Sequence, residues 1–116
     1  MKDTLSDMRA EYARLLEHSL RQIVEKLSMV EEVKRVSVFG SYARGRVDLF
    51  TDLDLLVILQ TDKGPVERLQ MLYSLIAAPV DIDILCYTPQ EFEALKDHGF
   101  LKQALENELV LVAKPL

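Results

Sequence analysis

The most constraining feature of the sequence is an almost wholly apolar run from Leu53 to Leu59, interrupted only by Asp54. A short run of this composition fits a β-strand that is covered on both faces. Such a strand lies in the middle of a sheet, and its two faces must be covered by other elements. The run therefore predicts an α/β (α+β) fold, in which a small mixed sheet of about three or four strands is flanked by helices.

Other periodic patterns predict the elements around this central strand. Apolar residues from about Leu5 to Ser28 recur at the spacing of one buried helix face, which indicates a long amphipathic helix. Pro65 is placed as the first residue of a helix to about Ala78, and the capping box at Thr88 starts a helix to about His98, with Gly99 as its C-cap. The remaining predicted elements are strands at Val33 to Phe39, Val80 to Tyr87 and Glu108 to Ala113 (the last at an edge), a short helix at Tyr42 to about Arg46, and a last helix at about Phe100 to Asn107.

Length and composition limit the class of protein. The 116 residues are expected to form a single domain spanning 1–116. A net charge of −5 argues against a protein that coats nucleic acid, so no stable nucleic-acid binding is expected. The lone Cys86 cannot form an internal disulfide, which favours a cytoplasmic location. No apolar run approaches the roughly 20 residues of a membrane span, so no membrane association is expected.

Two pairs of carboxylates suggest a site for metal ions. Because side chains alternate along a strand, Asp52 and Asp54 are expected to share one face. Nucleotidyl transfer suits such a pair, because carboxylates can hold two divalent cations ~3.5 to 4 Å apart. We interpret Asp52 and Asp54 as metal ligands that are completed by a third aspartate. The third predicted strand offers both Asp81 and Asp83, which also share a face, so both remain candidates.

Gly40 and Ser41 directly follow the first predicted strand. A glycine at this position either adopts a positive φ or lets another backbone or a phosphate approach closely. Ser41 can cap the short helix, and a helix start with free N–H groups binds anions. We therefore expect Gly40 and Ser41 to hold the β and γ phosphates of a nucleoside triphosphate, although the pair alone also fits an ordinary turn and cap. Arg44 either contacts phosphate or anchors the helix to a neighbouring acid.

Together these residues carry a family resemblance. Gly40-Ser41-x-Ala43-Arg44-Gly45, followed by Thr51-Asp52-x-Asp54, resembles the signature of the DNA polymerase beta-like nucleotidyltransferase superfamily. In particular the chain resembles its minimal nucleotidyltransferases, the MNT or MntA-like antitoxins of prokaryotic HEPN/MNT toxin–antitoxin pairs. The resemblance covers nearly the whole chain. Two residues depart from the usual pattern, since Thr51 stands where serine is commoner and Arg46 where many relatives carry an acidic or polar residue.

The resemblance implies an activity and a partner. Relatives of this kind transfer AMP from Mg²⁺-bound ATP, with two Mg²⁺ ions, and the antitoxins attach it to a tyrosine of a partner HEPN ribonuclease, which is thereby silenced. Family matching assigns Gly40 and Ser41 to the phosphates and Asp52 and Asp54 to the metal. Counting back from Thr88 favours Asp83 as the third metal ligand and as the base for the attacking hydroxyl.

Two other functions stay open. The chain can be a binding module that neutralises its partner by covering it, with the exposed parts of the first helix and the C-terminal edge as the interface. Alternatively, it can transfer a nucleotide to a small molecule such as an aminoglycoside, which is less favoured because the sequence offers no second domain to hold that substrate. A homo- or hetero-oligomer is compatible with any of these functions.

Overall fold

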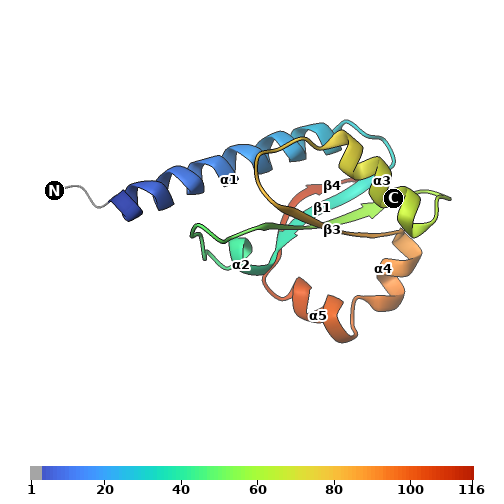
Figure 1. Cartoon of the computed structure of the whole chain (residues 1–116). Helices are drawn as coiled ribbons and strands as arrows, with labels where there is room; N and C mark the ends of the chain where they lie inside the picture. Colours follow the sequence, from blue (N-terminus) through green and yellow to red (C-terminus); the bar gives the residue numbers. More distant parts are fainter. Residues whose placement is uncertain (1–3) are drawn as a thin grey trace.

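The computed structural model describes residues 4–116, which form five helices and four strands (Figure 1). The mixed α/β class predicted from the apolar run is confirmed. In chain order the elements are α1 (Thr4–Ser28), β1 (Val33–Phe39), α2 (Gly40–Ala43), β2 (Leu53–Leu59), α3 (Pro65–Leu75), β3 (Ile82–Tyr87), α4 (Pro89–Leu95), α5 (Gly99–Leu105) and β4 (Leu109–Ala113).

The four strands form one mixed sheet in the order β3-β2-β1-β4. β1 pairs antiparallel with both β2 and β4, whereas β2 pairs parallel with β3. The apolar run at β2 therefore lies inside the sheet, and β4 lies at an edge, as the sequence predicted. The parallel pair matters most for the site, because it aligns the start of β2 with the start of β3.

Helices cover both faces of the sheet (Figure 1). On one face, α1 and α3 pack against alternate residues of β1 and β2 to form the main core. On the other face, α4 and α5 cover a smaller cluster that contains Leu56 and Ile58 of β2. Buried residues of the main core are Leu16, Leu20, Ile23, Leu27, Val33, Val36, Val38, Leu53, Leu55, Val57, Leu59, Leu72 and Ile84.

The first turns of α1 extend beyond the sheet (Figure 1). The sequence predicted one continuous buried face, and the second half of α1 does bury Leu16, Leu20 and Ile23. Met8, however, is 49% exposed, because the sheet does not reach that far. The prediction is thus wrong for the start of the helix. No helix of residues 4–116 is long and apolar enough to cross a membrane.

Several predicted boundaries are also wrong. α3 ends at Leu75 because Ile76 adopts extended backbone, and β3 begins at Ile82. α4 ends at Leu95, so Gly99 is not its C-cap and instead begins α5 with φ +51°. In the segments that follow α3 and α4, the packing of the chain overrides the local preference for helix.

Ser41 does not cap the short helix. α2 begins two residues earlier than predicted, at Gly40, and Phe39 occupies the N-cap position with no side-chain hydrogen bond. The positive φ of Gly40 turns the chain directly from β1 into the helix. The Ser41 side chain is therefore left for other contacts.

The predicted capping box at the start of α4 is present and is tied to α3. The Thr88 hydroxyl accepts a hydrogen bond from the backbone N–H of Glu91 at 3.2 Å, and the Glu91 carboxylate accepts one from the backbone N–H of Thr88 at 3.0 Å. Arg68 of α3 is buried and also donates to Glu91, at 2.7 Å. The bond from Arg68, followed by the bond from the Thr88 backbone, lowers the pKa of Glu91.

We expect Thr88→Ala to lower the free energy of unfolding by about 1 kcal/mol, because the N–H of Glu91 loses its partner. Urea denaturation of the two proteins measures this difference. Thr88→Ser is the matched control and should stay close to wild type, since it keeps the hydroxyl. Equal losses in both variants would show that the methyl group of Thr88, and not its hydroxyl, carries the stabilisation.

Candidate active site

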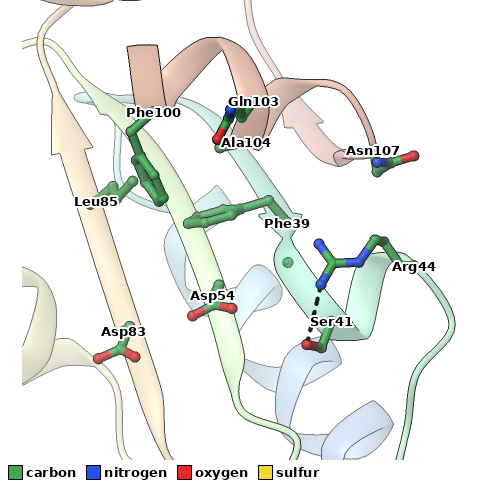
Figure 2. A pocket seen from close by; sticks show the side chains of 11 residues that line it. Phe39, Ser41, Arg44, Asp54, Asp83, Leu85, Phe100, Gln103, Ala104 and Asn107 are labelled. Atoms are coloured by element: carbon green, nitrogen blue, oxygen red, sulfur yellow. Dashed lines mark hydrogen bonds between the residues drawn. The ribbon is translucent and has the colours of Figure 1, made fainter.

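The register between β2 and β3 places two of the predicted carboxylates beside each other. Asp54 of β2 and Asp83 of β3 are direct partners in the parallel pair. Both side chains point to the side of the sheet that α5 covers (Figure 2). Asp81 precedes β3, and its backbone carbonyl accepts a hydrogen bond from the N–H of Leu53 at 3.1 Å.

A cavity of about 430 Å³ opens above these two carboxylates. Its polar side is formed by Gly40, Ser41, Arg44, Asp54 and Asp83, which are five of the six predicted site residues (Figure 2). The sixth, Asp52, lines a neighbouring cavity of about 500 Å³, which shares Ser41 and Asp54 with the first. The predicted residues therefore lie around two adjoining cavities that meet at Ser41 and Asp54, whereas Asp81 lines neither.

Asp54 carries the strongest electrostatic signature at this site. Partial burial raises the pKa of its carboxyl, and the nearby charges of Asp83 and Asp52 raise it further. The guanidinium of Arg44 acts in the opposite direction. Like charges gathered at a partly buried position favour binding of a cation, which offsets their repulsion. Oxygen ligands of this kind suit Mg²⁺, which takes few protein ligands and keeps several waters.

The backbone at Gly40 packs closely against the Asp54 carboxylate. Its φ is +72°, and a Cβ built on it would lie 2.3 Å from Oδ2 of Asp54. The sequence predicted either a positive φ or the close approach of a backbone or a phosphate at this glycine; the positive φ is confirmed, and the group that approaches is a side-chain carboxylate. What approaches Gly40 is the predicted metal ligand itself, so the turn after β1 and the carboxylate of β2 fit together only without a side chain here.

Arg44 lies next to Ser41. Its Nη2 atom is 3.5 Å from the Ser41 hydroxyl, at the limit of a hydrogen bond, and the contact is exposed (Figure 2). Within residues 4–116, no ion pair joins Arg44 to an acid. Of the two roles predicted for Arg44, an anchor to a neighbouring acid is therefore absent, and the guanidinium faces the cavity.

The loop before Asp52 is held by contacts that the sequence did not reveal. The buried Thr51 hydroxyl donates to the carbonyl of Arg46 at 2.9 Å and accepts from the N–H of Asp48 at 3.0 Å. The hydroxyl of Tyr12 in α1 donates to the Thr51 carbonyl at 3.0 Å. Burial, and then the charges of Asp52 and Asp81, raises the pKa of Tyr12. The hydroxyl at position 51 thus holds the loop in place.

Within residues 4–116, no group of three or more His, Cys, Asp or Glu side chains is gathered closely enough to hold a metal ion. Asp54 and Asp83 share a cavity, and Asp52 faces the adjoining one. The donor set nevertheless fits Mg²⁺, because the carboxylates lie on neighbouring strands and the absence of a side chain at Gly40 leaves room for the Asp54 carboxylate.

A comparison with protein families agrees with this geometry. The family model described as "Polymerase beta, Nucleotidyltransferase" matches residues 21–114. The chain belongs to this family. The resemblance seen in the sequence is therefore confirmed, and the site residues lie within the matched segment of this nucleotidyltransferase. No curated protein matches the chain significantly.

Solved structures share the fold. A putative nucleotidyltransferase from Sulfolobus solfataricus superposes with a TM-score of 0.57 at 21% identity, covering 94% of this chain and 87% of that one. A mutant of the toxin–antitoxin MntA-HpeT gives a TM-score of 0.51 at 18% identity, covering 84% and 72% of the two chains. A toxin–antitoxin with AMP-PNP gives 0.52 at 16% identity, covering 84% and 73%. At sequence identities this low, the comparison shows that these proteins share a fold with this chain.

The opposite side of the cavity was not predicted. It is formed by Phe39, Leu85 and residues of or after α5, namely Phe100, Gln103, Ala104 and Asn107 (Figure 2). No spacing in the sequence brings the residues of or after α5 to the motif, because their position depends on how α5 folds back over the sheet. The nucleotidyltransferase cavity therefore has a charged side that the sequence reveals and an apolar, amide-bearing side that it does not.

We expect Gly40→Ala to weaken Mg²⁺-dependent nucleotide binding on the order of 10- to 100-fold, as mutation of a residue that positions a metal ligand typically does. The physical reason is the 2.3 Å approach of the new Cβ to Asp54. Gly45→Ala is the matched control, since Gly45 also has a positive φ, +81°, but nothing lies within 4 Å of its Cβ position. Both variants should lose about 1 to 2 kcal/mol of folding stability. Equal nucleotide affinities in the two, by titration calorimetry, would contradict the fit between Gly40 and Asp54.

The raised pKa of Asp54 predicts a gain of stability on removing its charge. In metal-free buffer at pH 7, Asp54→Asn should be more stable to urea than wild type, because the folded state disfavours the ionised carboxyl. Because the pKa of Asp54 is higher in the folded state, this group stabilises the folded protein at pH values below its unfolded-state pKa of about 3.8. That stabilisation is lost as the pH rises through the folded-state pKa. The advantage of the variant should therefore shrink at pH 3. If the variant were less stable than wild type at pH 7, the ionised Asp54 carboxyl would not be destabilising in the folded state, and the prediction would be wrong.

Proposed function

We propose that this chain is a Mg²⁺-dependent nucleotidyltransferase that transfers AMP from ATP to a hydroxyl, that of a tyrosine, on a partner HEPN-type toxin, and so acts as an antitoxin. The observation that carries the proposal is the alignment of Asp54 and Asp83 across β2 and β3 beside the Gly40-Ser41 turn. Membership of the polymerase beta nucleotidyltransferase family supports the reaction class.

The residues around the cavity suit the two tasks of binding and orienting a triphosphate. The backbone at Gly40, the hydroxyl of Ser41 and the guanidinium of Arg44 lie on one side of the cavity, where they can donate to the β and γ phosphates. Asp52 and Asp54, with Asp83, are the proposed ligands of two Mg²⁺ ions, which when bound neutralise charge on the triphosphate and on the departing pyrophosphate.

In the proposed reaction, the acceptor hydroxyl oxygen forms a bond to the α phosphorus of ATP. The bond from that phosphorus to the oxygen bridging the α and β phosphates breaks, and pyrophosphate leaves with the electron pair. Asp83 accepts the proton of the attacking hydroxyl. β3 forms the edge of the sheet and Asp83 is exposed, so a hydroxyl from another molecule can reach this carboxylate.

Surface features of the chain support a protein as the acceptor. Phe50 is 90% exposed and lines the same cavity as Asp52. Met8 of α1 and the uncharged edge strand β4, with exposed Leu109, Val110 and Leu111, add further apolar surface. Isolated apolar side chains such as Met8 are ordinary, but an uncharged edge strand with consecutive exposed apolar residues favours an interface. Two structural neighbours are described as toxin–antitoxin complexes, which supports a toxin as the partner.

We expect the purified chain, with ATP, MgCl₂ and a candidate HEPN-type toxin from a neighbouring gene, to increase the toxin's mass by one or more AMP units. Intact-mass spectrometry and mapping of the modified residue measure this. Asp52→Asn and Asp54→Asn should abolish transfer while circular dichroism stays native. Asp83→Asn should lower the rate on the order of 10²- to 10⁴-fold, the usual contribution of a general base.

Asp81→Asn is the matched control, because Asp81 is two residues from Asp83 but lines neither cavity. It should transfer AMP at close to the wild-type rate. An unmodified toxin that is nevertheless inhibited, even by a chain with Asp52, Asp54 and Asp83 all replaced, would support a binding module instead. If a small molecule were modified and the toxin were not, the proposed nucleotidyl transfer would stand, but the proposed protein acceptor would be wrong.

A further inference from the structure

The side of the cavity formed by α5 has a composition that phosphate binding does not explain. Phosphates and metal ions need charged or hydrogen-bonding groups, and those are gathered at Gly40, Ser41 and Arg44. The opposite side presents two aromatic rings, an aliphatic side chain and two carboxamides. A cavity of about 430 Å³ is within the range of small-ligand sites and exceeds what a triphosphate group alone requires.

Phe100 is the most unusual of these residues. It is 62% exposed although the next residue, Leu101, is buried against the sheet and holds α5 in place. The ring of Phe100 meets that of the buried Phe39 edge to face, with centroids 6.2 Å apart and an interplanar angle of 78°. Phe100 thus packs against Phe39 within the protein, and the rest of its ring is exposed to the cavity (Figure 2). An aromatic ring in this position can stack on a planar heterocycle.

Gln103 lies one turn after Phe100 on α5, and its carboxamide lies near the two rings (Figure 2). Asn107 follows α5 and lies closer to Arg44. Within residues 4–116, neither side-chain amide is hydrogen-bonded to another residue. A carboxamide offers one acceptor and two donors, so it can pair with the adjacent amino group and ring nitrogen of adenine. The N7 and O6 edge of guanine, with two acceptors, is a poorer match.

We infer that the α5 side of the cavity is the nucleoside subsite, in which Phe100 stacks on the base and Gln103 pairs with the edge of adenine. This inference rests on the proposed function, since it assigns the other end of the same triphosphate substrate. It divides the cavity into a charged side that holds phosphates and an apolar side that selects the base. Phe39 supports Phe100.

Binding of unreactive ligands tests the subsite separately from catalysis. Titration calorimetry with Mg²⁺ should use three ligands, a non-hydrolysable ATP analogue, the matching GTP analogue and inorganic tripolyphosphate. Wild type should bind the ATP analogue most tightly. Phe100→Ala should weaken binding of both nucleotides on the order of tenfold, as loss of one stacking contact does, and should leave tripolyphosphate affinity unchanged. Gln103→Leu should reduce the preference for the ATP analogue over the GTP analogue.

Met29→Ala is the matched control, because Met29 is an exposed apolar residue, 78% exposed, that lines neither cavity of the site. It should bind all three ligands as wild type does. Equal affinity of wild type for tripolyphosphate and for nucleotides, or a loss of tripolyphosphate binding in Phe100→Ala as large as that of nucleotides, would overturn the subsite while leaving the proposed function standing. Failure of wild type to bind any of the three ligands would overturn both.

Discussion

The site depends on the parallel pairing of β2 with β3. That pairing sets Asp54 directly opposite Asp83, and a shift of one residue would turn one of the two carboxylates to the other face of the sheet. The register is fixed by burial, since β2 contributes residues to the cores on both faces. The apolar character that makes β2 a central strand therefore also determines where its one carboxylate is placed.

Gly40 connects this register to the phosphate side of the cavity. Because its missing side chain leaves room for the Asp54 carboxylate, β1 can end and α2 can begin within contact of β2. That compactness partly buries Asp54 and brings Asp83 close to it, so that burial first, and then the charge of Asp83, raises the pKa of Asp54. The free protein is thus strained at the position where a cation would relieve the strain.

The sequence predicted the parts of this arrangement that depend on local rules. Period-two alternation, the capping box at Thr88 and the isolated acid in β2 gave the class of fold and the carboxylate motif. Alternation placed Asp52 and Asp54 on one face, yet Asp52 lies before β2 begins at Leu53 and lines the adjoining cavity. The family resemblance favoured Asp83 over Asp81, whereas the register that sets Asp83 beside Asp54 depends on residues far apart in the chain.

Other features lie beyond local rules for the same reason. The bond from Tyr12 to Thr51 joins residues 39 positions apart, and no spacing in the sequence indicates it. The contribution of α5 to the cavity is a second example, because Phe100 and Gln103 meet the motif only after the chain has crossed the sheet. The sequence predicted that Ser41 caps the short helix. In the structure the positive φ of Gly40 turns the chain into α2 before Ser41, so Phe39 occupies the cap position.

The two faces of the sheet differ in how firmly they are held. The main core joins β1 and β2 to α1 and α3, whereas α5 is attached through the smaller cluster of Phe39, Leu56, Ile58 and Leu101. Local opening requires free energy in proportion to the contacts given up, so α5 can separate from the sheet while the main core stays folded. We therefore expect the helix that covers the cavity to open locally, and its amide hydrogens to exchange faster than those of β2.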